Sequence, residues 1–479
     1  MIQSTDCCAS SPRFRTHFQT AATEHPRVGD RAAVSRAPAV VDVMGGICEE
    51  GGSLVLTATL GIAVRIGCWQ TQGRELTIRF HGPSDDGTPR TFAMPMASLG
   101  AGEPIGGAVL AACTRANAAW AAPICLAVHR AIHEEAIPRP AGGLMVLVHS
   151  DFPAGSDLGS PCATAAAVID ALARLFGVEI DRFRRAAIAA HSVSVITGMP
   201  RLRIAMTSLC GAPDGSLLQL RFLPQFSCEP LALPAGVTIS AVRTTLARPT
   251  TIERIQETRL CAEMGTRMIH ELRRKEAAAA DARTAHLAAI TPAEYVERYR
   301  DQLPSKITAQ AFVARFGEVR GLDPATNPRE VYKVRSRAEH HIYENRRVHD
   351  FVTNIVRARR TPSPESLIQA GELMYASHWS HSQRCGIGGV ESDKLVHFIR
   401  QRGAKDGLFG AKVTGGGEGG EIVVLMRDDD ASRAALAAAV EDAGAACGRP
   451  IEVFHGSLAG LEYFEPTEMA DLLGAPAAV

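Results

Sequence analysis

The stretch SDFPAGSDLGSPCATAAAVIDALARLFG, residues 150–177, constrains the fold most, because a loop of small residues in it leads directly into a helix. The apolar run at 144–149 precedes it and predicts a buried strand. From Ser160 onward, apolar residues recur every three or four positions, at Ala165, Ile169, Leu172 and Phe176. A strand, a glycine loop and a helix in this order suit anion binding, because the backbone N–H groups of the loop and the helix N-terminus point at the ligand.

The remaining pattern predicts an α+β protein, with sheet and helices in the first half and mostly helices in the second. We expect strands at 52–58, 62–67, 76–80, 421–426 and 450–455. We expect helices at 104–119, about 181–193, 250–283, 336–358, 366–380 and 431–444. Residues 1–34 carry no apolar core segment and are predicted to form a flexible, loosely ordered extension.

Composition narrows the class of protein further. Lys plus Arg and Asp plus Glu number 51 each, so no strong net field favours nucleic acid or an anionic membrane surface. No apolar run reaches the roughly 18 residues of a membrane span. The twelve cysteines include no C-x-x-C pair, which predicts reduced thiols and a cytoplasmic protein. No cluster has zinc-ligand spacing, and we interpret His340, His341, His378 and His381 as helix-surface or core histidines rather than a metal site.

Three glycine-containing stretches follow one another along the chain: APAVVDVMGGICEEGGSLVL at 37–56, the loop after residue 150, and GAKVTGGGEGGEIVVL at 410–425. As an ordered set they resemble the three motifs of the GHMP small-molecule kinases, and within them the galactokinase and L-arabinokinase branch. Segments at 259–269, 340–351, 371–378 and 385–395 also resemble that branch. The resemblance covers about residues 36 to 465.

The resemblance implies a two-lobed GHMP kinase fold with a cleft between the lobes. It predicts an N-terminal lobe over 35–235, with a mixed sheet and helices, and an α+β C-terminal lobe over 236–479. We expect the N-terminus of the helix that begins at Ser160 to face the glycine stretch 415–420 across the cleft. ATP and Mg²⁺ are the cofactors that the family implies.

The second motif of the family reads approximately Pro-x-Gly-x-Gly-Leu-Gly/Ser-Ser-Ser-Ala-Ala. The matching residues here, predicted to form the phosphate loop, are Pro153, Gly155, Leu158, Gly159 and Ser160. Asp157 replaces a family glycine, and Pro161 replaces a serine whose hydroxyl helps to hold magnesium. Pro161 is compatible with the first turn of a helix after a Ser160 cap. Asp157 either competes with phosphate for the loop amides or serves as an internal helix cap.

The family's catalytic positions are occupied by residues that cannot ionise. Val40 stands at the position of the arginine that assists phosphoryl transfer. Val193 stands at the glutamate that holds magnesium, and Ile204 or Ala205 at the aspartate that acts as base. Because phosphoryl transfer depends on charge stabilisation, these losses predict that ordinary Mg·ATP sugar kinase activity is absent.

The expected ligand is a small-molecule sugar, sugar phosphate or other anion, with Asp42, Glu49, Glu50, Arg201 and Arg203 as candidate binding residues. Glu49 stands where the family has an aspartate that accepts sugar hydroxyls, and both glutamates are alternatively solvated turn residues. Arg201 and Arg203, expected in a loop, point either to solvent or inward to an anionic ligand.

The third motif contributes a structural glycine loop at Gly415, Gly416, Gly417 and Gly419, which either contacts the ligand or is purely architectural. Three functions remain open. The chain is a repurposed enzyme, a non-catalytic sugar-sensing regulator, or an active sugar-1-kinase whose base and metal ligands are other residues such as Asp151 or Asp157.

Overall fold

A computed structural model describes residues 11–83, 88–100, 106–156, 158–199, 201–212, 215–244, 246, 250–276, 286–325, 327–361, 363–417 and 420–464. The chain divides into two compact units. Unit 1 comprises residues 1–41, 58–216 and 456–479, and unit 2 comprises residues 42–57 and 217–455. The α+β class is confirmed.

Unit 1 is built on a mixed sheet with the strand order β4-β3-β5-β2, and β1 also pairs with β2. The strands are β1 (Arg27–Met44), β2 (Val55–Thr71), β3 (Glu75–His81), β4 (Arg90–Pro95) and β5 (Gly143–Ser150). β5 runs parallel to β3 and antiparallel to β2. The separate strands predicted at 52–58 and 62–67 form one strand, because Gly61 continues the extended backbone between them.

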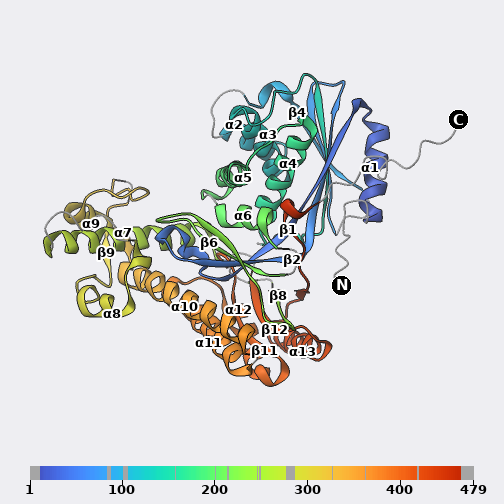
Figure 1. Cartoon of the computed structure of the whole chain (residues 1–479). Coiled ribbons are helices and arrows are strands. Elements are labelled where there is room, and N and C mark those ends of the chain that lie inside the picture. Colours follow the sequence, from blue (N-terminus) through green and yellow to red (C-terminus); the bar gives the residue numbers. More distant parts are fainter. Residues whose placement is uncertain are drawn as a thin grey trace. The chain divides into compact units, whose positions relative to one another are not determined.

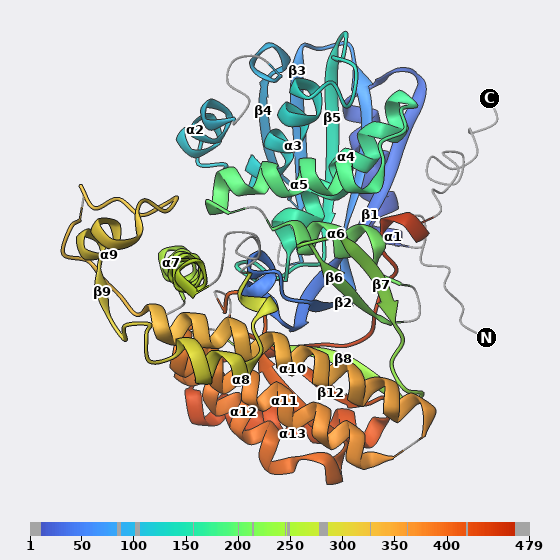
Figure 2. The ribbon, with the colours of Figure 1, turned by 60° about the vertical axis from the view of Figure 1, so that its left-hand side comes forward.

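Helices cover both faces of this sheet (Figures 1 and 2). On one face lie α3 (Ala122–His133), α4 (Ser160–Phe176) and α5 (Arg182–Thr197), with α2 (Gly107–Arg115) beside α3 and α6 (Leu202–Cys210) beside α4 and α5. α1 (Pro12–Glu24) packs on the opposite face against β5. The apolar spacing that predicted α4 is confirmed, since most of its residues are buried.

The prediction of a flexible extension is wrong for residues 12–34. Helix α1 begins at a Ser11 cap whose hydroxyl accepts a hydrogen bond from the Phe14 N–H. Its Phe14 and Phe18 are fully buried and pack with Trp69 of β2. The sequence pattern missed this helix because its two aromatic residues stand among polar neighbours and form no continuous apolar run.

Unit 2 contains a four-stranded antiparallel sheet in the order β11-β12-β8-β13. These strands are β8 (Val237–Thr244), β11 (Leu408–Val413), β12 (Glu421–Arg427) and β13 (Ile451–Phe454). Helices α10 (Val334–Arg360), α11 (Pro364–Ser380), α12 (Val390–Arg402) and α13 (Asp430–Cys447) accompany it, and α11 and α12 pack on β11. A second core joins α7 (Ile252–Glu276), α9 (Ala309–Phe316) and α10, with α8 (Pro292–Glu294) nearby.

The predicted boundary at 235/236 differs from the observed division. Residues 42–57, which contain the Gly-Gly turn of the first motif, and the hairpin of β6 (Leu217–Arg221) and β7 (Ser227–Leu231) group with unit 2. The chain therefore enters unit 2 twice. The first three residues of β2, Val55 to Thr57, pair with β6 through tertiary contacts that no local pattern encodes.

Candidate functional site

The predicted phosphate loop joins β5 to α4, which confirms the strand, loop and helix expected over 150–177. Gly159 is the N-cap of α4, with φ of 76°, and Ser160 is the first helical residue. Ser160 was predicted to be the cap itself, so the helix begins one residue earlier than expected. Gly159, as the N-cap, has no side chain that could accept a hydrogen bond from the helix, and Pro161 lies in the first turn. Asp157 and Gly419 lie outside the described residues.

Two residues that the sequence predicts to occupy catalytic positions of the family, Val40 and Ile204, lie near Gly159. A Cβ atom built on Gly159 would lie 2.7 Å from Ile204 Cγ2 and 3.5 Å from Val40 Cβ. The Val40 N–H also donates to the Leu158 carbonyl at 2.9 Å. Val40 is 1% exposed and Ile204 is 4% exposed. The surroundings of Gly159 are therefore apolar and closely packed.

Arg201 and Arg203 were expected in a loop, but Arg201 is the N-cap of α6 and Arg203 lies inside that helix. The Arg201 carbonyl accepts hydrogen bonds from the Ile204 and Ala205 N–H groups and, at 3.9 Å, from the Cys162 thiol of α4. Arg203 is 2% exposed, so its side chain does not point to solvent. The start of α6 thus packs beside the start of α4.

Asp151, considered as a substitute base or metal ligand, is engaged in the sheet. Its carboxylate accepts from Arg65 Nη1 at 2.8 Å and from the Ala63 N–H at 3.3 Å. Its own N–H donates to the Ala63 carbonyl. Asp151 therefore anchors the end of β5 to β2, and its carboxylate is neutralised by a neighbouring guanidinium.

The loop fits a phosphate group better than it fits a metal. The N-terminus of α4 offers N–H groups and the positive end of the helix dipole. Val193, which the sequence predicts to stand at the family's magnesium glutamate, is fully buried on α5 and its side chain has no oxygen to offer a metal. Pro161 has neither a hydroxyl nor an N–H. These residues do not fit the Mg²⁺ that the family implies.

In unit 2 the first and third motifs lie side by side. The Asp42 N–H donates to Thr414 Oγ1 at 2.7 Å. A Cβ on Gly46 would lie 3.8 Å from the Gly415 carbonyl oxygen and 3.6 Å from His381 Nε2. Asp42 is 1% exposed. The glycine loop and the Gly-Gly turn are therefore parts of one packed structure.

Gly417 favours the architectural alternative for the third motif. Its φ is 68°, and an added Cβ would lie 3.0 Å from both the Gly388 nitrogen and Ile387 Cγ2. The loop is thus held by its own neighbours in unit 2. The predicted opposition of this loop and the N-terminus of α4, which belong to different units, stays a prediction.

A buried charged cluster of Glu344, Arg347 and Lys412 supports the first motif. Glu344 accepts from the Gly45 N–H at 3.2 Å, from Ser377 Oγ at 2.6 Å and from Arg347 Nε at 2.7 Å. Burial would raise the pKa of Glu344, but Arg347 and other nearby cationic groups outweigh it and lower the pKa to about 2. Lys412, fully buried, donates to the Val413 carbonyl, and burial lowers its pKa against the opposing effect of Glu344.

Sequence reasoning assigned no role to these three residues. The signal was present, because Glu344 and Arg347 lie in the family-like segment at 340–351 and Lys412 lies in the third motif. A buried ion cluster cannot be recognised from such a segment, since its members come from α10 and β11 and meet only in the folded unit.

Glu49 and Glu50, the candidate sugar-binding carboxylates, share one guanidinium. Arg259 of α7 lies 3.6 Å from Glu49 Oε1 and donates to Glu50 Oε1 at 2.7 Å. Glu49 is 4% exposed, so it is not a solvated turn residue, whereas the Glu50 side chain is half exposed.

The four histidines considered as metal ligands, His340 and His341 of α10 and His378 and His381 of the α11 region, are all buried. The imidazoles of His341 and His381 hydrogen-bond the carbonyls of Arg337 and Ser377, and His378 accepts from the Val413 N–H. This arrangement matches core histidines. In the described part of the chain, no group of three or more His, Cys, Asp or Glu side chains is arranged to hold a metal ion.

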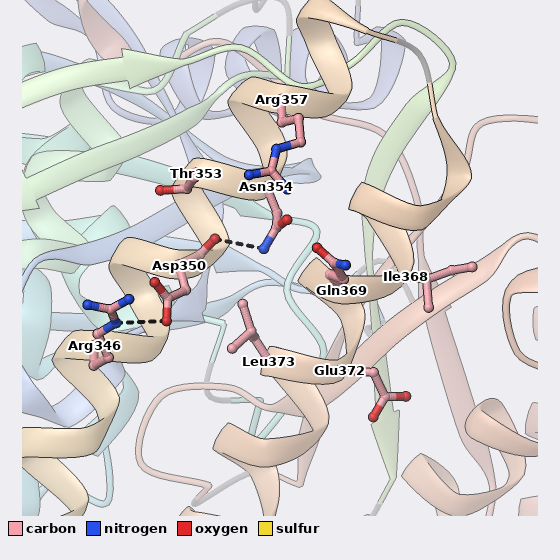
Figure 3. A pocket seen from close by; sticks show the side chains of 9 residues that line it. All are labelled: Arg346, Asp350, Thr353, Asn354, Arg357, Ile368, Gln369, Glu372 and Leu373. Atoms are coloured by element: carbon pink, nitrogen blue, oxygen red, sulfur yellow. Dashed lines mark hydrogen bonds and ion pairs between the residues drawn. The ribbon is translucent and has the colours of Figure 1, made fainter. Parts of the chain in front are cut away.

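A cavity of about 620 Å³ opens between α10 and α11 (Figure 3). Its lining side chains are Arg346, Asp350, Thr353, Asn354, Arg357, Ile368, Gln369, Glu372 and Leu373. Arg346 is paired with Asp350 across one turn of α10. No residue of the three motifs lines this cavity, so it is separate from the candidate site. No helix in the described ranges has the length and apolarity that a membrane span requires.

The segment that contains the loop and α4 also matches a known protein family. The family described as GHMP kinases N terminal domain matches residues 123–201, which include the loop, α4 and α5. The chain therefore carries a GHMP kinase N-terminal domain.

The chain is homologous to L-arabinokinase and galactokinase. It is 27% identical to L-arabinokinase of Arabidopsis thaliana over 442 residues, which are 81% of this chain and 42% of that protein. It is 28% identical to galactokinase of Mycobacterium tuberculosis over 306 residues, 63% of this chain and 68% of the relative. The chain thus spans less than half the length of the L-arabinokinase.

A solved structure confirms the fold. The crystal structure of Lactococcus lactis galactokinase complexed with galactose matches with a TM-score of 0.66 at 17% identity, covering 93% of this chain and 98% of that one. The GHMP kinase fold predicted from the sequence is therefore present.

Proposed function

We propose that this protein binds a sugar, a sugar phosphate or a related anion without transferring phosphate from Mg·ATP to neutral sugars. The observation that carries the proposal is the contact of Val40 and Ile204 with Gly159 at the start of α4. By the resemblance, these two positions hold an arginine and an aspartate in active kinases. Here they present methyl groups that neither stabilise a transferring phosphoryl group nor accept a proton.

The contact with Gly159 favours Ile204 over Ala205 as the residue at the base position. Ile204 is the side chain that the structure brings within van der Waals reach of the loop glycine. Asp151 does not replace the missing base, because its carboxylate is held by Arg65 and by the Ala63 N–H. An active sugar-1-kinase is therefore not favoured.

The cationic character that remains favours an anionic ligand. The buried Arg203 follows Arg201 at the start of α6, beside the first turn of α4. The N-terminus of α4 also favours negative charge. In unit 2, Asp42 and Glu49 retain carboxylates suited to hydroxyl groups. The galactose-bound relative supports a sugar as the ligand class.

The test combines a turnover assay with a binding assay on the full chain. We expect no ADP release above background over a panel of neutral sugars that includes galactose and L-arabinose, with Mg·ATP present. Calorimetry is expected to detect a sugar phosphate or a sugar acid, with affinity that falls on Arg201→Ala. An exposed control, Arg346→Ala on α10, should leave that affinity unchanged. Turnover of a neutral sugar at about 1 per second or faster, an ordinary kinase rate, would overturn the proposal.

A further inference from the structure

Three histidines of unit 1 form a cluster where α1 covers the sheet. His17 is on α1, His81 is the last residue of β3, and His149 is near the end of β5. The rings of His17 and His81 are stacked, with centroids 3.6 Å apart and an interplanar angle of 11°. The centroids of His17 and His149 lie 5.5 Å apart. Because His81 and His149 are partners in the parallel β3–β5 ladder, the sheet holds both imidazoles against the same helix.

The charged groups around the histidine cluster are mostly paired with one another. Those that face it from the packed elements are Arg13 and Glu24 on α1, Arg65 on β2, Arg79 on β3, and Asp151 after β5. Arg79 pairs with Glu24, and Arg65 pairs with Asp151. Both carboxylates are therefore already engaged with a guanidinium, and Arg13 adds further positive charge.

These surroundings favour neutral imidazoles in the folded protein. Burial, together with Arg13 and Arg79, lowers the pKa of His17. Burial also outweighs the opposing effect of Asp151, whose Oδ1 lies 3.9 Å from His149 Nδ1, and the pKa of His149 falls to about 4. Protons on both His17 and His81 would place two positive charges in rings that are 3.6 Å apart. The closed arrangement of α1 on the sheet is thus disfavoured by protonation.

Helix α1 is attached to the sheet by few groups. It has 13 residues, of which Phe14, Phe18 and Ala21 are buried. At its end, the Trp69 indole N–H donates to the His25 carbonyl at 2.8 Å. A short helix with few buried side chains opens at a lower free-energy cost than the elements of a core. By contrast, α4 is buried along most of its length, so α1 is the element that can separate while the rest of unit 1 stays folded.

We propose that the histidine cluster is a pH-sensitive switch that releases α1 from the sheet of unit 1 when the pH falls below about 6. In the open state the imidazoles are in water and bind protons at an ordinary pH near 6.5. The closed state binds fewer protons over the same range. Its stability relative to the open state is therefore complete above about pH 6.5 and is lost as the pH falls.

Release of α1 changes the face of the sheet beside the phosphate loop. In the closed state Phe14 and Phe18 pack with Trp69 of β2 and with Met145 and Leu147 of β5. Opening exposes these apolar side chains. β5 ends at Ser150, where the predicted phosphate loop begins, so the switch acts on the strand that carries this loop.

Hydrogen exchange of the full chain at pH 7 and pH 5 tests the proposal, after correction for the pH dependence of intrinsic exchange. His149 alone should increase the opening of α1 about 20-fold between these two values, because its pKa is about 4 in the closed state. The amides of α4 should keep their protection. Unchanged protection of α1, or an equal loss in α1 and α4, would overturn the proposal.

Tryptophan fluorescence provides a second measurement. The chain has three tryptophans, and the double variant Trp120→Phe/Trp379→Phe leaves Trp69 as the only one. Trp69 is fully buried, and its ring centroid lies 4.9 Å from that of Phe18. Its emission should shift to longer wavelength on acidification as α1 separates. If this variant does not fold, hydrogen exchange of the unchanged protein still decides.

A pair of histidine variants assigns the effect to the cluster. His17→Gln removes one titrating ring from the stack, so the fold-change in α1 exchange between pH 7 and pH 5 should be smaller than in the unchanged protein. His25→Gln is the matched control, because it alters a histidine at the end of the same helix and outside the cluster. It should keep the full pH dependence. The same fold-change in His17→Gln as in the control would show that the cluster is not the switch.

Discussion

The two units of the chain differ in how they use burial. In unit 1 the apolar Val40 and Ile204, which we predict to stand at charged catalytic positions of the family, pack on Gly159. In unit 2 buried charges remain, with Glu344 hydrogen-bonded to the first-motif turn and Lys412 beside it. Because buried charges are costly unless they are paired, their presence in unit 2 indicates a structure maintained around the first and third motifs. The packing around Gly159 is apolar, whereas the packing around the first and third motifs encloses paired charges.

The largest effect should come from breaking the charged cluster of unit 2. Glu344→Gln removes the carboxylate that pairs with the Arg347 guanidinium and that supplies the largest opposing charge to the buried Lys412 ammonium. We expect a loss of about 3–5 kcal/mol of unfolding free energy, measured by denaturant unfolding. The matched control is Glu372→Gln on α11, whose exposed pair with Arg400 should contribute about 1 kcal/mol or less. Equal losses in both variants would contradict a special role for the cluster.

The apolar contact of unit 1 is tested by Gly159→Ala. The φ of 76° disfavours alanine, and the new Cβ would lie 2.7 Å from Ile204 Cγ2, so we expect a loss of about 2–4 kcal/mol. Gly236→Ala, with φ of 71° and no atom within 4 Å, isolates the backbone component and should cost about 1 kcal/mol.

A double-mutant cycle sharpens this result. Combining Gly159→Ala with Ile204→Ala should recover about 1 kcal/mol or more of coupling energy, because the truncated side chain makes room for the new methyl group. Strict additivity of the two changes would show that the contact does not exist.

Unit 1 should also lose stability in acid through His149. Burial lowers the pKa of His149 to about 4, with smaller effects from Asp151, which raises it, and from Arg65, His17 and Arg13, which lower it. The folded state therefore binds fewer protons than the unfolded state between pH 6.5 and 4. The free energy of unfolding that His149 contributes is complete above pH 6.5 and is lost as the pH falls toward 4. This loss amounts to at most about 3 kcal/mol.

Thermal unfolding between pH 4 and 7 measures this dependence in the unchanged protein and in His149→Gln. The stability of the variant should fall less steeply with decreasing pH. The difference in slope should correspond to at most one bound proton. His397→Gln, which alters an exposed imidazole on α12, is the control and should follow the unchanged protein. A decline of equal slope in all three proteins would assign the acid sensitivity to other groups, such as the buried His340 and His381 of unit 2.

The smallest effect is expected at the pair of first-motif glutamates. Glu50→Gln weakens a half-exposed ion pair with Arg259 and should change stability by less than about 1 kcal/mol. Glu49→Gln alters a buried carboxylate beside the same guanidinium and should cost more. Denaturant unfolding of both variants measures the two losses of unfolding free energy. A larger loss for Glu50→Gln than for Glu49→Gln would show that Glu49 is not part of the packed structure of unit 2.

The sequence by itself determined the α+β class, several helices and strands, and the family-like motifs of this protein. The periodicity from Ser160 onward predicted α4, and the apolar run before it predicted β5, because both signals are local. The glycines of the loop likewise predicted a tight turn, because a left-handed φ such as that of Gly159 favours a residue without Cβ. The ordered motifs then predicted the GHMP kinase fold.

The tertiary structure decided which residues meet. It placed Ile204 rather than Ala205 on Gly159, buried Arg203 inside a helix, and grouped residues 42–57 with unit 2. It also brought Glu344 to the backbone of Gly45, 299 positions away along the chain. Contacts of this separation depend on how helices and sheets pack, because burial and charge pairing are properties of the folded unit, whereas helical and strand periods are properties of the local chain.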